Sequence, residues 1–136
     1  MNTSSLEKAL TSLESAIQIY RQGLVPLGSP AEALLRDGIL QRFEYTFELS
    51  WKTLKRYLEE YGIEQVDRFS NKQLFRVGFE SGLLTSAEKW LDYLSRRNLT
   101  SHVYDEETAQ KVYCIIEDFI VDVHYLLKQL TLRINA

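Results

Sequence analysis

The chain has 136 residues, of which 45% are hydrophobic and 26% are charged, and its formal net charge is −3. These values are typical of one globular domain that buries a core without disulfides or metals, so we expect a single domain over residues 1–136. The negative charge argues against a broad phosphate-binding surface, because surfaces of that kind are usually basic.

The sequence predicts a cytoplasmic protein. The single cysteine, Cys114, excludes a disulfide within the chain and fits a reducing compartment. The first residues have neither the basic region nor the apolar core of a signal peptide. No apolar stretch approaches the length of a membrane span, so we expect no membrane association.

The first half of the chain predicts two long helices. Apolar residues recur at helical spacing over residues 5–22, and Gly23 then provides a stop. After a loop, Pro30 suits the first turn of a second helix over residues 31–61. Gly38 weakens the helical pattern locally and allows a kink or a break there.

The second half predicts one short helix and two longer ones. Ser70 can cap a short helix over residues 70–80, and Ser86 can cap the next helix, which contains Trp90. Asp105 can cap the last helix, which has broad apolar coverage as far as Leu130. The expected fold is therefore all-α: an up-and-down four-helix bundle with one short extra helix.

The sequence contains no recognisable metal or cofactor motif. It has no Gly-rich phosphate loop, no Cys/His cluster and no His-Glu-x-x-His pattern, and it has only two histidines. One of them, His124, lies among apolar residues on the last helix and is interpreted as structural. We therefore expect neither a metal nor a cofactor.

Residues 97–104 form a polar interruption between the last two long helices. This segment contains Arg97, Asn98, His102 and Tyr104. A guanidinium group can hold a phosphate and an imidazole can transfer a proton near neutral pH, which is sufficient for metal-free RNA cleavage. However, an arginine shortly before a histidine is common by chance, and such residues also cap helix ends. A site and a purely structural role both remain open on these residues alone.

The second helix offers another candidate surface. Trp51 could stack on a base and Lys52 could contact a phosphate. Phe43 and Phe47 are interpreted as core residues, whereas core and ligand roles are equally open for Trp51. Glu48 is interpreted as the i,i+4 partner of Lys52 on a solvated helix face.

Two motifs in the chain resemble those of a known superfamily. Arg97-x4-His102-x-Tyr104, with Asn98 after the arginine and a long helix following, resembles the signature of the HEPN superfamily of helical, usually dimeric proteins. Residues 42–52, RFEYTFELSWK, resemble the second helix of the branch that partners a minimal nucleotidyltransferase and is called its substrate-binding protein. The resemblance covers residues 6–130 and implies a HEPN-like fold.

In the HepT-like members of this branch, the resemblance implies an RNase toxin that its nucleotidyltransferase silences by transferring AMP to a tyrosine. Carried over, Arg97 would bind the scissile phosphate and His102 would act as general base or acid. Asn98 would position the substrate or His102, and Tyr104 would accept the nucleotide. The implied assembly is a homodimer in which Arg97/His102 pairs meet across the two-fold axis and form a cleft for RNA or a nucleotide.

Two other interpretations use the same residues. The chain could be a non-catalytic adaptor that docks the nucleotidyltransferase and presents a substrate. It could also be an unrelated structural bundle, if Arg97 and His102 are buried and satisfy each other within one subunit.

Overall fold

The computed structural model describes residues 1–100 and 105–135, and most of these residues are helical. The elements in chain order are α1 (Ser4–Arg21), α2 (Pro30–Glu60), the 3₁₀ turn η1 (Val66–Arg68), α3 (Asn71–Glu80), α4 (Ala87–Thr100) and α5 (Glu106–Ile134). The ends predicted for the first two long helices lie within one residue of those observed. None of the helices in this described part has the length and apolarity that a membrane crossing requires.

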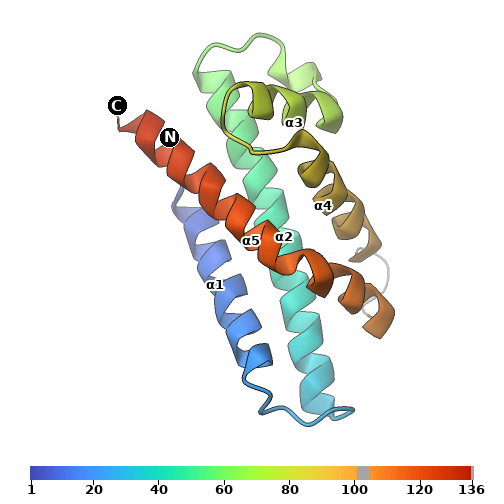
Figure 1. Ribbon diagram of the computed structural model, residues 1–136. Coiled ribbons are helices and arrows are strands. Elements are labelled where there is room, and N and C mark those ends of the chain that lie inside the picture. The colour runs from blue at the N-terminus through green and yellow to red at the C-terminus, as the bar shows by residue number, and fades with distance from the viewer. Residues whose placement is uncertain (101–104, 136) are drawn as a thin grey trace.

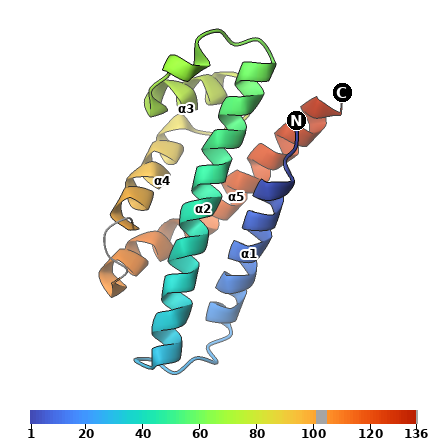
Figure 2. The same cartoon turned by 180° about the vertical axis from the view of Figure 1, so that it is seen from behind.

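Helix α2 runs the length of the molecule, and the other long helices pack along it (Figure 1). Helix α1 lies antiparallel on one side of α2, α4 lies on the other side, and α5 crosses all three obliquely (Figures 1 and 2). The short α3 covers the end of the bundle where α2 finishes. This arrangement confirms the predicted all-α bundle with a short extra helix.

A cluster of aromatic rings occupies the centre of the bundle. Phe119 of α5 packs against Phe43 of α2 and Tyr93 of α4, with ring centroids 4.9 and 5.1 Å apart. Trp90 of α4 and Phe47 of α2 complete the group, with centroids 6.0 and 6.5 Å from Phe119. All five side chains are buried, which confirms the core roles predicted for Phe43 and Phe47. Rings from two other helices therefore meet on one residue of α5.

The predicted caps define the starts of the later helices. Ser70 accepts a hydrogen bond from the Gln73 N–H, and the Gln73 side chain accepts one from the Ser70 N–H, which completes a capping box. Asp105 accepts a bond of 2.7 Å from the Thr108 N–H at the start of α5. This hydrogen bond lowers the pKa of the Asp105 carboxyl below its usual value.

Helix α2 continues without interruption through Gly38, where the sequence allowed a break. The guanidinium of Arg42 donates to the Gly38 carbonyl oxygen at 3.1 Å and to the Ser12 hydroxyl of α1 at 2.9 Å. Tyr45 also donates to Ser12, at 3.0 Å. The first residues of the 42–52 motif therefore attach α2 to α1.

Candidate functional site

The structure corrects the predicted start of the polar interruption after α4. Residues 97–100 belong to the last turn of α4, and Thr100 is buried and donates a hydrogen bond to the Arg97 carbonyl oxygen. Arg96 donates to the Lys111 carbonyl oxygen of α5 at 2.7 Å. Its neighbour Arg97 turns to α2 instead, where its Nε lies 3.1 Å from the Glu48 carboxylate. These contacts to α5 and α2 hold the last turn of α4 in helical form. Its polar composition alone would not favour a helix.

The ion pair with Glu48 brings Arg97 to the second motif of the sequence. Glu48 also accepts a hydrogen bond of 3.2 Å from the indole N–H of Trp51. The ammonium group of Lys52 lies over the Trp51 ring, 5.7 Å from its centroid. Arg97, Trp51 and Lys52 were predicted from separate parts of the chain, and the structure places them on one surface between α2 and α4. We call the group Glu48, Trp51, Lys52 and Arg97 the α2–α4 cluster.

The remaining predicted site residues follow Arg97 closely in the sequence. Asn98 follows Arg97 in the last turn of α4, and its side chain is exposed. His102 and Tyr104 lie outside the described residues, so the roles predicted for them stay predictions. Trp51 is half-buried and packs against the core.

Sequence reasoning missed the part that Glu48 plays. The i,i+4 spacing suggested a solvated pair of Glu48 with Lys52, whereas the carboxylate bonds to Arg97 and Trp51. The available signal was the position of Glu48 inside the 42–52 motif. Its partner 49 residues away is set by packing between helices, which local spacing does not report.

A buried polar contact fixes α4 against α5 one turn before Arg97. The Tyr93 hydroxyl donates to the carboxylate of Asp122, and the Thr85 hydroxyl donates to the same carboxylate at 3.2 Å. Asp122 is only 5% exposed, so these two bonds replace much of the hydration that its carboxylate has lost. Burial and the neighbouring Asp122 charge raise the pKa of Tyr93 well above its usual value.

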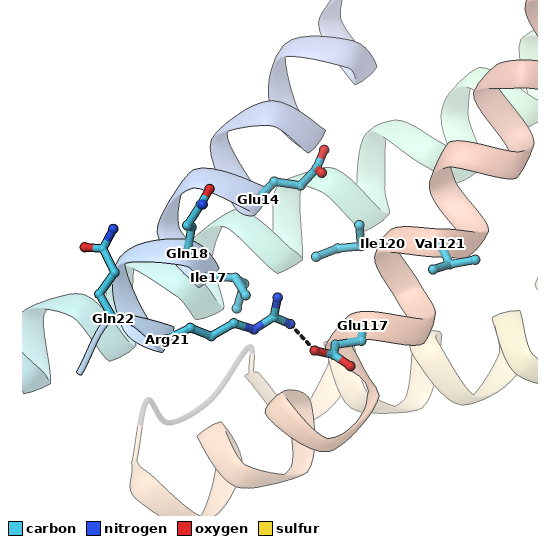
Figure 3. Close-up of a pocket in the computed structure, with 8 residues that line it drawn as sticks. All are labelled: Glu14, Ile17, Gln18, Arg21, Gln22, Glu117, Ile120 and Val121. Atoms are coloured by element: carbon cyan, nitrogen blue, oxygen red, sulfur yellow. Dashed lines mark hydrogen bonds and ion pairs between the residues drawn. The ribbon is translucent and has the colours of Figure 1, made fainter.

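Two grooves lie away from the α2–α4 cluster. One of about 770 Å³ lies between α1 and the first half of α2, and one of about 620 Å³ lies between α1 and α5. In the second groove Arg21 reaches from α1 to an ion pair with Glu117 of α5, and Ile17 and Ile120 point into the space between the helices (Figure 3). None of the described candidate residues lines either groove.

His124 is exposed on α5, and its Nε2 lies 3.1 Å from the carboxylate of Glu14 on α1. The contact joins α5 to α1. No group of three or more His, Cys, Asp or Glu side chains suited to a metal ion occurs within residues 1–100 and 105–135.

Comparisons with known proteins cover nearly the whole chain. Residues 1–132 match a family model described as nucleotidyltransferase substrate binding protein like. A Haemophilus influenzae protein named probable ribonuclease HepT is 35% identical over 137 residues, which cover 98% of this chain and 94% of that protein.

Two solved structures share the fold. One from Haemophilus influenzae, described as the fold of a substrate binding domain of a nucleotidyltransferase, has a TM-score of 0.85 and 36% identity. The match covers 96% of this chain and 99% of that one. A crystal structure from Thermus thermophilus has a TM-score of 0.68 and 32% identity, with 92% of this chain and 98% of that one covered.

The contact between Tyr93 and Asp122 predicts that wild type and Tyr93→Phe differ in their free energy of unfolding by an amount that depends on pH. At pH 8, Tyr93→Phe should lower the free energy of unfolding by about 1–3 kcal/mol, because Asp122 loses a buried partner. The folded-state pKa of Tyr93 is raised, so its contribution is complete below the unfolded pKa of about 10 and is lost as the pH rises further. The gap between wild type and Tyr93→Phe should therefore narrow above pH 10.

Urea unfolding followed by circular dichroism from pH 8 to pH 11 measures this gap. Thr85→Val is the matched control, because it also removes a hydrogen bond to Asp122 but leaves Tyr93 to titrate. The difference in free energy of unfolding between Thr85→Val and wild type should not change with pH. A gap for Tyr93→Phe that is equally independent of pH would contradict the assignment.

Proposed function

Because the chain belongs to the nucleotidyltransferase substrate binding protein like family, we propose that it binds RNA or a nucleotide at Arg97 and His102 and cleaves RNA without a metal. This membership removes the interpretation as an unrelated bundle and makes a nucleotidyltransferase the expected partner. The observation that carries the proposal is the α2–α4 cluster, which joins Arg97 to an accessible tryptophan and a lysine. The 35% identity to a protein named as a probable ribonuclease supports the RNase form.

The proposed chemistry needs only the groups that these residues carry. A base takes the proton of the ribose 2′-OH, whose oxygen attacks the neighbouring phosphorus, and an acid protonates the departing 5′-oxygen. His102 fits either proton-transfer role, because imidazole titrates near neutral pH. The guanidinium of Arg97 stabilises the negative charge on the pentacovalent phosphate. Trp51 and Lys52 would hold a neighbouring base and phosphate, and Asn98 would position the substrate or His102.

The proposal includes the cellular setting implied by the family resemblance. A minimal nucleotidyltransferase would act as antitoxin and transfer AMP from ATP to the hydroxyl of Tyr104, with release of pyrophosphate. We propose the cytoplasm as the location, since RNA and ATP are both available there.

A non-catalytic adaptor is the second candidate function. The solved neighbour described as a substrate binding domain of a nucleotidyltransferase favours it. In this form the same residues would bind a substrate and present it to the partner, and no bond would break at Arg97 or His102. The two forms differ in whether the isolated protein cleaves RNA.

The RNase form predicts that Arg97→Ala and His102→Ala each reduce RNA cleavage by about 100-fold or more and relieve growth arrest on expression. Cleavage by the wild type should continue in EDTA and leave 2′,3′-cyclic phosphate ends, since the attacking oxygen is the 2′-OH. Lys72→Ala, an exposed change on α3, is the control and should cleave normally. A wild type that neither cleaves RNA nor arrests growth would exclude the RNase form and leave the adaptor.

The proposed transfer of AMP to Tyr104 predicts a mass increase of one or more AMP units when the protein is incubated with its partner nucleotidyltransferase and ATP. Tyr104→Phe should show no increase, because the acceptor hydroxyl is gone. Intact-protein mass spectrometry measures the gain. If Tyr104→Phe gains the same mass as the wild type, Tyr104 is not the acceptor.

We propose a homodimer in which the last turns of α4 approach each other near the two-fold axis. The apolar excess of the last helix supports self-association, since Val121 and Leu132 are exposed on α5.

The exposed Leu99 neighbours Arg97, so Leu99→Cys in a Cys114→Ser background should form a disulfide-linked dimer under oxidation. Lys72→Cys in the same background is the control and should remain uncrosslinked. A monomer by light scattering at micromolar concentration would overturn the proposal.

A further inference from the structure

The Glu48 carboxylate makes two different contacts, one with each oxygen. Oε1 accepts from Nε of Arg97 at 3.1 Å, and Oε2 accepts from the indole Nε1 of Trp51 at 3.2 Å. Arg97 comes from α4, whereas Trp51 lies one turn after Glu48 on α2. A single side chain therefore connects a cation on one helix with an aromatic ring on another.

This bridge is less exposed to water than the other ion pairs found in residues 1–100 and 105–135. The side chains of Arg97 and Glu48 are 23% and 32% exposed, compared with 53% and 74% for the pair of Arg21 with Glu117. Screening by solvent weakens an exposed pair, and a half-buried pair in good geometry keeps more of its attraction. The contact can therefore hold the orientation of both groups.

The geometry of the bridge also determines which N–H groups of Arg97 would bind a ligand. A guanidinium carries five N–H donors in one plane, and the bond to Glu48 uses the donor on Nε. The remaining donors belong to the two Nη groups, which form the fork that binds phosphate oxygens in pairs. The bond at Nε restrains the direction in which that fork points, and the bond at the indole N–H restrains the position of the Trp51 ring.

We propose that Glu48 is a positioning residue that locks Arg97 and Trp51 into one unit, so that a phosphate and an adjacent base of single-stranded RNA are bound at a set separation. The inference rests on the proposed function of Arg97 and deepens it. Lys52, whose ammonium group lies over the Trp51 ring, adds a second cation beside the same base. The ligand chemistry is a phosphodiester flanked by an unpaired base.

Glu48→Gln tests the bridge with almost no change of shape. A carboxylate offers an acceptor to each donor, whereas an amide offers one acceptor and turns its NH₂ group toward the other donor. The variant can therefore hold Arg97 or Trp51, but not both. Glu59→Gln is the matched control, because Glu59 lies on the same helix in an exposed pair with Lys55.

We expect Glu48→Gln to lower kcat for RNA cleavage by about 10- to 100-fold, as misplacement of a phosphate-binding group does, with KM changed by less than about threefold. Glu59→Gln should leave both values unchanged. If Glu48 instead competed with phosphate for Arg97, removing its charge would raise the rate. An unchanged or faster Glu48→Gln enzyme overturns the proposal.

A double-mutant cycle separates positioning from general stability. Trp51→Phe keeps a ring for stacking but removes the indole donor, so Glu48→Gln should cost less in that background than in wild type. If Glu48 only joined α2 to α4, the loss of kcat would be equal in the two backgrounds. Equal losses would therefore contradict the proposed unit.

Proton–nitrogen NMR of the free protein tests the bridge without reference to cleavage. The Arg97 Nε–H and Trp51 Nε1–H signals, assigned with Arg97→Lys and Trp51→Phe, should both move in Glu48→Gln and stay in place in Glu59→Gln. Signals that do not respond to Glu48→Gln would overturn the bridge itself. If the bridge is present but a non-cleavable 2′-deoxy oligonucleotide does not bind, the proposed function fails and the positioning role fails with it.

Discussion

The position of α4 depends on a polar contact inside the core of the bundle. The Asp122 carboxylate on α5 has given up nearly all its water, and the hydroxyls of Tyr93 and Thr85 hydrogen-bond to it. Such a group is costly unless its hydrogen bonds are made, so α4 has one preferred height and rotation against α5. Arg97 lies one turn beyond Tyr93, and its reach toward α2 follows from that placement. The candidate site is thus built outward from the core.

Most of the fold could be predicted from the sequence because local patterns determine it. Apolar spacing defined the long helices, and Ser70 and Asp105 marked helix starts by a mechanism that acts within four residues. The end of α4 was predicted too early, since its last residues are polar and are held by Arg96 and Arg97 through partners on other helices. Gly38 was interpreted as a weak point, yet the bonds of Arg42 span that turn of α2.

Part of the candidate site could also be predicted, and the remainder needed three-dimensional contacts. Arg97, Trp51 and Lys52 were selected for their chemistry, but nothing in the sequence indicated that they share a surface. The residue that joins them, Glu48, was assigned a local partner because helix spacing reports only neighbours on the same helix. The roles proposed for His102 and Tyr104 come from the family resemblance, because no spacing rule provides them.

The spacing of the contact residues on α4 limits which sequence changes this helix can accommodate. Trp90, Tyr93 and Arg97 follow a three- and four-residue spacing, so one stripe of the helix serves the aromatic core, the Asp122 contact and the bridge to Glu48. One inserted or deleted residue between Tyr93 and Arg97 would rotate the guanidinium by about 100° around the helix axis. Exchange of individual side chains in this stretch is therefore far easier to accommodate than any change in its length.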